Sequence, residues 1–179
     1  VLYNVKNPGS LATADFDEDG FIDLVVTNLT YDSISVLHGR GNGTFQGERS
    51  FKAADSPEFI AVADINNDNN ADVVTANLIS DSLSILLGTG KGSFQAEPIY
   101  TVGEFPRAMI AGDLNSDGVT DLVTANGSFE GENISVLLGL EDGTFQLNQT
   151  LATGSQPFSI TSGDFNRDGL PDLASANAD

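Results

Sequence analysis

The sequence predicts an all-β fold, because of its hydrophobic pattern and its internal repetition. Of its 179 residues 40% are hydrophobic, and they fall in short β-branched runs such as "DLVVTN" and "SISVLHG". No segment carries helical periodicity over ten residues. A nine-residue acidic motif occurs four times. The chain is therefore expected to be a folded array of repeats made of short strands.

The acidic motif repeats together with its flanks. It reads "DFDEDGFID" from Asp15, "DINNDNNAD" from Asp64, "DLNSDGVTD" from Asp113 and "DFNRDGLPD" from Asp164, at spacings of 49, 49 and 51 residues. A proline lies seven residues before each copy, and runs such as "DVVTAN" and "GKGSFQ" follow it in the same phase. Whole modules are therefore duplicated.

Each module predicts four short strands, at 10–16, 23–28, 33–39 and 45–53 in the first copy, bounded by Gly, Asn, Asp or Pro. Four strands in about 50 residues, repeated, are typical of a β-propeller blade of four antiparallel strands. The residue before each motif is small, as expected for innermost strands that converge on a crowded axis: Ala14, Ala63, Gly112 and Gly163. A sandwich would not require this.

The phase of the repeats predicts one propeller segment over 1–179. We expect residues 1–8 to be the last strand of a preceding blade, and 9–56, 57–105 and 106–156 to be complete blades. Residues 157–179 are expected to be the first half of a further blade. Such a ring is partial or incomplete, and its open blade edges invite pairing with another chain or another copy.

The motif itself predicts a metal site. Asp or Asn at positions 1, 3 and 5, with Asp at 9, presents oxygen ligands on a tight loop, and position 7 can offer its carbonyl. Hard oxygen donors without His or Cys favour Ca²⁺. Position 6 must turn sharply, which Gly20, Gly118 and Gly169 tolerate and Asn69 permits. An EF-hand is excluded, because position 12 lies inside a strand and is not Glu.

The phased pattern D-x-[DN]-x-D-[GN]-x-x-D with a "GxGTFQ" hairpin resembles the FG-GAP/VCBS repeats of integrin-alpha-like β-propellers. The resemblance covers essentially the whole chain and implies one Ca²⁺ per loop, about four in all, with a structural role. The implied ligands, of which Phe21, Asn70, Val119 and Leu170 act through their backbone carbonyls, are Asp15, Asp17, Asp19, Phe21, Asp23, Asp64, Asn66, Asp68, Asn70, Asp72, Asp113, Asn115, Asp117, Val119, Asp121, Asp164, Asn166, Asp168, Leu170 and Asp172. Since the first loop has four carboxylates and the others three, it is expected to bind most tightly.

Charge and composition exclude several functions. The formal charge of −19 argues against nucleic acid or an anionic membrane surface as partner, and no apolar run is long enough for membrane insertion. The absence of cysteine removes disulfides and thiolate chemistry. The only histidine, His38, stands where the sister repeats have Leu87 and Leu138, so we interpret it as a tolerated substitution. No catalytic triad stands out, and the chain is predicted not to be an enzyme.

We therefore expect a secreted or cell-surface module for adhesion or recognition. Its ligand, a protein or a carbohydrate, is expected on a loop face, with Tyr31 and Phe129 as candidate contacts or as packing residues. A lectin propeller, and a structural repeat of a surface filament or large secreted protein, stay open as alternatives. Five N-x-S/T sequons would make a secreted eukaryotic chain a candidate glycoprotein: Asn28, Asn42, Asn126, Asn133 and Asn148.

Overall fold

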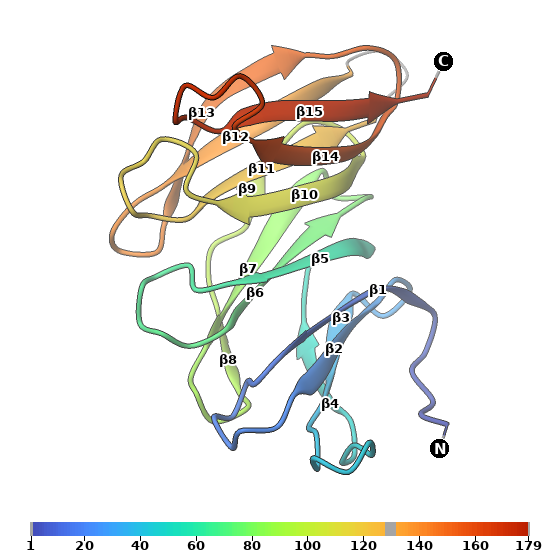
Figure 1. Cartoon of the computed structure of the whole chain (residues 1–179). Helices are drawn as coiled ribbons and strands as arrows, with labels where there is room; N and C mark the ends of the chain where they lie inside the picture. The colour runs from blue at the N-terminus through green and yellow to red at the C-terminus, as the bar shows by residue number, and fades with distance from the viewer. Residues whose placement is uncertain (1, 128–131, 179) are drawn as a thin grey trace.

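The computed structural model describes residues 2–127 and 132–178, and within them it confirms an all-β fold of antiparallel sheets (Figure 1). In the first and third blades the strands pair in chain order, and in the second β5 to β8 do so while β9 pairs with β7. The strands are β1 (Pro8–Ala14), β2 (Asp23–Asn28), β3 (Ser33–Leu37) and β4 (Arg49–Lys52); β5 (Pro57–Ala63), β6 (Asp72–Asn77), β7 (Ser82–Gly88), β8 (Phe94–Ala96) and β9 (Tyr100–Thr101); β10 (Pro106–Gly112), β11 (Asp121–Asn126), β12 (Asn133–Gly139) and β13 (Phe145–Ala152); and β14 (Pro157–Gly163) and β15 (Asp172–Asn177).

The sheets are stacked as a fan around their innermost strands. In chain order β1, β5, β10 and β14 lie against one another, and each sheet extends outward from this line (Figure 1). The fan does not close, so the described residues form part of a propeller. A methyl group added at Gly112 would meet no other atom, so the crowding that we expected at this position is not found. The open fan leaves room beside the strand.

The hydrophobic core lies between neighbouring sheets. One face of β2 and β3, with Val25 and Ile34, packs against Ile60 and Val73 of the second blade. The same arrangement joins the second blade to the third, and the third to the β14–β15 hairpin. Because no sheet buries its apolar face alone, each blade depends on its neighbour for stability.

Aromatic pairs add a second contact between successive blades at the outer edge. The rings of Phe51 and Phe94 meet edge to face with centroids 5.1 Å apart, and those of Tyr100 and Phe145 at 5.6 Å. The backbone N–H of Phe145 also donates to the Tyr100 hydroxyl over 3.2 Å. The phenylalanine of each "GTFQ"-type turn thus packs against the outer edge of the preceding blade.

The predicted strands differ from the observed ones mainly at the outer edge. The strand expected at 45–53 is β4, only Arg49–Lys52, preceded by an isolated bridge between Gly39 and Phe45. Residues 2–7, expected to be the last strand of a preceding blade, form no strand. Within the described residues no further strand lies beside them to complete a ladder, although Tyr3 packs on Phe45. The blade boundaries stay a prediction.

Candidate calcium sites

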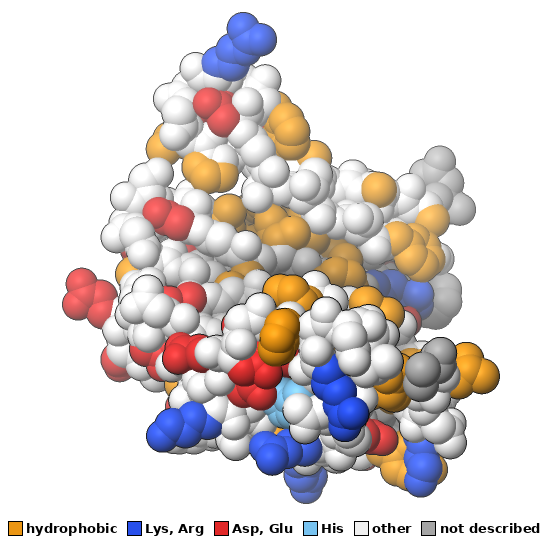
Figure 2. Space-filling model, turned by 60° about the horizontal axis from the view of Figure 1, so that its bottom comes forward, with side chains coloured by type: hydrophobic (Ala, Val, Ile, Leu, Met, Phe, Trp, Pro, Cys, Tyr) orange, Lys and Arg blue, Asp and Glu red, His pale blue; other side chains and the backbone are white. Residues whose placement is uncertain are grey.

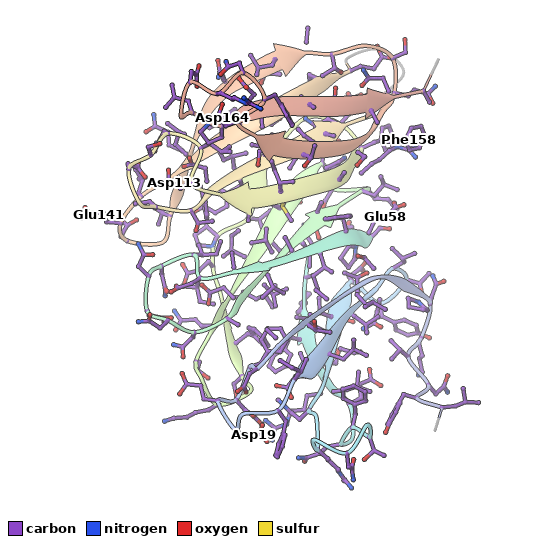
Figure 3. The ribbon with its side chains drawn as sticks, viewed as in Figure 1. Asp19, Glu58, Asp113, Glu141, Phe158 and Asp164 are labelled. Atoms are coloured by element: carbon purple, nitrogen blue, oxygen red, sulfur yellow. The ribbon has the colours of Figure 1, made fainter. Side chains whose placement is uncertain are left out.

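The four acidic loops lie at one end of the fan. Each connects the innermost strand of a sheet to the second strand, so all four loops leave their sheets at the same edge. In Figure 3 Asp19, Asp113 and Asp164 lie on this side, while Glu58 and Phe158 lie at the opposite end. The fold therefore gathers the acidic motifs into a row along one end of the blades.

Backbone amides hold the carboxylates at positions 1 and 5 of every loop. In the third loop Asp113 accepts hydrogen bonds from the amides of Asp117 at 3.2 Å and Gly118 at 2.9 Å. Asp117 in turn accepts one from the amide of Val119 at 2.8 Å. The other three loops repeat these bonds, including the second, which has Asn69 in place of Gly. The loops are therefore shaped by their own backbone hydrogen bonds.

The aspartate at position 9 joins the loop to the sheet. Asp121 is fully buried, and its two oxygens accept from the amide of Leu114 at 2.9 Å and from Gly139 at 2.8 Å. Asp23 and Asp72 are equally buried and bond in the same way. The glycine that supplies the second amide lies at the end of the third-strand segment of each full blade. Sequence reasoning did not connect it to the loop, although its repetition at one phase was a usable signal.

Each loop contains two residues with left-handed backbone conformation. At position 6, Asn69 has φ 68° and Gly118 has φ 84°, as predicted. At position 4 the structure adds a second such residue, with φ between 57° and 66°, although none of the four is glycine: Glu18, Asn67, Ser116 and Arg167. This second left-handed residue was not predicted.

The residue at position 3 of the first loop differs from that of the other three loops. In loops two to four an asparagine donates its side-chain amide to the position 5 carboxylate, at 3.1, 2.8 and 3.0 Å. Asp17 cannot donate in this way, and one of its oxygens is buried without a hydrogen-bond partner. Ligand oxygens of Asp15, Asp17 and Asp19 lie within 4.8 Å of one another. Such a cluster of hard oxygens fits a divalent cation.

His38 completes this region. Its Nδ1 lies 3.2 Å from Asp23 and 3.3 Å from Asp17, and its side chain is 7% exposed. Sequence comparison of the repeats had suggested only that His38 replaces a leucine. The structure places it directly beneath the first loop.

Burial and mutual repulsion raise the pKa of two loop carboxyls. Burial raises the pKa of Asp72 to about 6, with the charges of Asp68 and Asp64 adding to the rise against the opposing amide hydrogen bonds. Burial, followed by the charges of Asp23 and Asp19, raises the pKa of Asp17, while His38 acts in the opposite direction. Hydrogen bonds led by the Gly118 amide lower the pKa of Asp113. Without a cation, part of the cluster is costly to ionise.

The pKa of Asp72 predicts how metal-free stability depends on pH. The folded carboxyl binds a proton more readily than the unfolded one, so its contribution to stability is present at low pH and is lost as pH rises through about 6. After dialysis against chelator, the free energy of unfolding in urea should be about 1 kcal/mol higher at pH 5 than at pH 7. Lower stability at pH 5 would contradict this assignment. In saturating Ca²⁺ the order should reverse, because bound metal requires the ionised form.

The sequence profile of the FG-GAP-like repeat matches three overlapping stretches, residues 15–75, 64–124 and 113–175. Together they span nearly the whole chain. The chain belongs to the FG-GAP-like repeat family. Each matched stretch begins at position 1 of one acidic loop. The loops described above therefore mark where each FG-GAP repeat starts in this sequence. No curated protein matches the chain.

Solved structures share the fold of this FG-GAP chain at low identity. BBS1N, solved in complex with ARL6DN, is 16% identical with a TM-score of 0.66, over 97% of this chain and 53% of that one. A lectin of Agrocybe aegerita that recognises terminal N-acetylglucosamine is 20% identical with a TM-score of 0.57, over 91% and 45%. The V. cholerae biofilm matrix protein Bap1 is 20% identical with a TM-score of 0.57, over 93% and 23%. The chain thus spans about half or less of each neighbour.

The opposite end of the FG-GAP blades carries the loops between second and third strands. Tyr31 is 57% exposed there, and the Lys6 amine lies 5.2 Å above its ring. Phe129 lies outside the described residues. Asp32 and Asp81 each cap the link to the next blade, accepting from the amides of Ser56 at 3.0 Å and Phe105 at 2.9 Å. These caps were not found from the sequence.

The sequons of the FG-GAP chain differ in accessibility. Asn28 and Asn126 are buried, and both donate to serine hydroxyls of the adjacent strand. A glycan on either would need the blade to open. Asn42 lies exposed in a turn. The part of the chain that the structure describes contains no helix that could span a membrane.

Proposed function

We propose that this chain is a calcium-stabilised, non-catalytic module for adhesion or recognition outside the cell. The observation that carries the proposal is the row of four acidic loops, each with carboxylate oxygens held in place by backbone amides. The proposed ligands are those implied by the repeat family. Asp15, Asp17, Asp19 and Asp23 with the Phe21 carbonyl would form the first site, and the matching positions of the other loops the rest.

Calcium would stabilise the fold by binding only the folded loop. Each cation would relieve the repulsion that raises the pKa of Asp17 and Asp72, and would tie the loop to the buried aspartate that joins it to the third-strand segment. Loops with three or four carboxylates and no bidentate Glu at position 12 are expected to be moderate binders, which suits the millimolar calcium of extracellular fluids. This range supports an extracellular location.

The end of the blades away from the calcium loops is the proposed recognition face. Large apolar side chains are exposed there, Tyr31 and Ile79 on connections and Phe158 near the start of β14. The structural neighbours include a lectin and a protein solved in complex with a partner, which supports either a carbohydrate or a protein as ligand. The likeness to a biofilm matrix protein keeps a structural role in a surface assembly as the second candidate.

A glycan array and a sedimentation experiment separate these candidates. The chain should bind a restricted set of glycans or a defined protein in Ca²⁺, and exchange of the loop at 29–32, for example Tyr31→Ser to match Ser80, should weaken that binding. The control variant Glu18→Gln changes a position of the first calcium loop that is not a proposed ligand. It should not weaken that binding. Ligand-free self-association in Ca²⁺, with no glycan bound, would favour the structural repeat instead. Turnover of a bound glycan would overturn the non-catalytic proposal.

A further inference from the structure

The first blade differs from its sisters at two positions that meet in space. At loop position 3 it has Asp17, where the other loops have asparagine. Immediately after β3 it has His38, where the second and third blades have Leu87 and Leu138. The two differences occur together in one blade, and their side chains are in contact.

The contact has the dimensions of a metal site with mixed ligands. Nδ1 of His38 lies 3.2 Å from Oδ2 of Asp23 and 3.3 Å from Oδ2 of Asp17. One ligand atom from each of the three residues lies within 4.8 Å of the other two. Two ligands bound at about 2.0–2.1 Å to a tetrahedral Zn²⁺ are roughly 3.3–3.4 Å apart. The observed separations are close to this value.

A hydrogen bond accounts for only part of the same contact. A ring nitrogen carries at most one hydrogen, so Nδ1 can donate to Asp23 at 3.2 Å, the long end of the N–H···O range, but not also to Asp17 at 3.3 Å. Oδ1 of Asp17 and Nε2 of His38 are buried without any hydrogen-bond partner. The buried ring therefore has one engaged edge, and that edge faces two carboxylates.

The second blade fixes the ring in this orientation. A methyl group at Gly92 would lie 2.7 Å from Nε2 of His38 and 3.3 Å from Cβ of Asp17, so the glycine turn packs directly on both side chains. The Gly92 amide also donates to the Phe16 carbonyl over 2.9 Å. In Figure 2 the only histidine, coloured pale blue, lies beside a group of acidic side chains. Asp17 is 24% exposed, which leaves an entry from solvent.

We propose that Asp17, Asp23 and His38 bind one borderline divalent transition-metal ion, for which Zn²⁺ is the probe. Imidazole is a poor partner for Ca²⁺ but a good one for Zn²⁺, and two carboxylates complete a three-residue set that leaves a fourth position for water. The site shares Asp17 and Asp23 with the proposed calcium site of the first loop. Zn²⁺ therefore displaces Ca²⁺ from that loop only, while the other three loops keep Ca²⁺.

Equilibrium dialysis of the untagged chain tests the proposal, with micromolar Zn²⁺ in millimolar Ca²⁺. The wild type should retain one Zn²⁺ per chain. His38→Leu and Asp17→Asn each install the residue of the sister blades, and both should weaken Zn²⁺ binding by more than the roughly 10–100-fold that loss of an outer-shell partner costs. The double variant Asn66→Asp, Leu87→His should gain a second Zn²⁺.

The single histidine gives an independent readout that does not depend on any variant folding. Its ring nitrogens yield one set of ¹⁵N signals, and Zn²⁺ should shift the Nδ1 signal in a one-to-one titration with Ca²⁺ in excess. An unshifted ring, or equal Zn²⁺ retention by wild type and His38→Leu, would overturn the proposal. Zinc retained by the wild type with no Ca²⁺ bound anywhere would leave the zinc site standing and refute the calcium proposal.

Discussion

Asp121→Ala should destabilise the chain by about 3–5 kcal/mol even when no metal is present. The substitution leaves the part-buried amide of Leu114 and the buried amide of Gly139 without acceptors, and each unsatisfied group costs about 1–3 kcal/mol. It also empties a fully buried position. The free energy of unfolding, measured in urea after removal of metal, should fall by this amount, and one calcium site should be lost as well.

Asp117→Ala is the matched control, because it removes a proposed ligand of the same loop from an exposed position. Its carboxylate bonds only within the loop, to the Val119 amide and to Asn115. Metal-free stability should therefore change by less than about 1 kcal/mol, while the calcium-dependent gain falls by one site. Equal losses for the two variants in chelator would contradict the role assigned to position 9.

Gly88→Ala should be about as damaging, for a steric reason. An added methyl group would overlap the backbone carbonyl of Ala71, and backbone atoms cannot step aside as a flexible side chain can. The same residue donates its amide to buried Asp72 over 2.6 Å, so any shift of the strand also disturbs that bond. We expect a loss of about 3 kcal/mol or more in the free energy of unfolding.

Gly47→Ala provides the comparison for Gly88→Ala. A methyl group at Gly47 would meet no other atom, and its backbone is not in the left-handed region. The variant should be neutral or up to about 1 kcal/mol more stable, because alanine restricts the unfolded chain. Similar destabilisation by the two substitutions would show that steric overlap is not what retains glycine at position 88.

Local features of this fold were predictable because the repeats display them four times. The strand at 23–28 was placed at its observed bounds, and the turn at loop position 6 was assigned to Asn69 as well as to glycine. These features depend on residues within nine positions of one another. Short β-branched runs and the backbone freedom of glycine and asparagine therefore predict them from the local sequence.

Contacts between distant segments were not predictable in this way. His38 looked like a leucine replacement, because only the packing of the third-strand segment beneath the first loop brings it to Asp17 and Asp23. Gly88 repeats in phase, yet nothing in its local sequence names Asp72 as its partner. Left-handed residues before proline, such as Phe105 with φ 52°, depend on a cap supplied by Asp81, 24 residues earlier.

The hydrogen-bonded shape of the loops and the repulsion among their carboxylates together explain why calcium should increase the stability of the fold. The amide hydrogen bonds already give each loop its shape, so little ordering remains for the cation to impose. The remaining cost is electrostatic, as the raised pKa values of Asp17 and Asp72 show. A divalent cation removes that cost, and its binding free energy adds to the stability of the blade.

Thermal unfolding in chelator, in Ca²⁺ and in Mg²⁺ measures whether calcium stabilises the blades. With each of four sites at about ten times its Kd, binding adds roughly 5–6 kcal/mol, or about 10–20 °C in Tm for a chain of this size. Tm should rise by this amount in Ca²⁺ and change little in Mg²⁺, whose octahedral preference the loops do not match. A Tm that is the same in chelator and in Ca²⁺ would contradict a stabilising role for calcium.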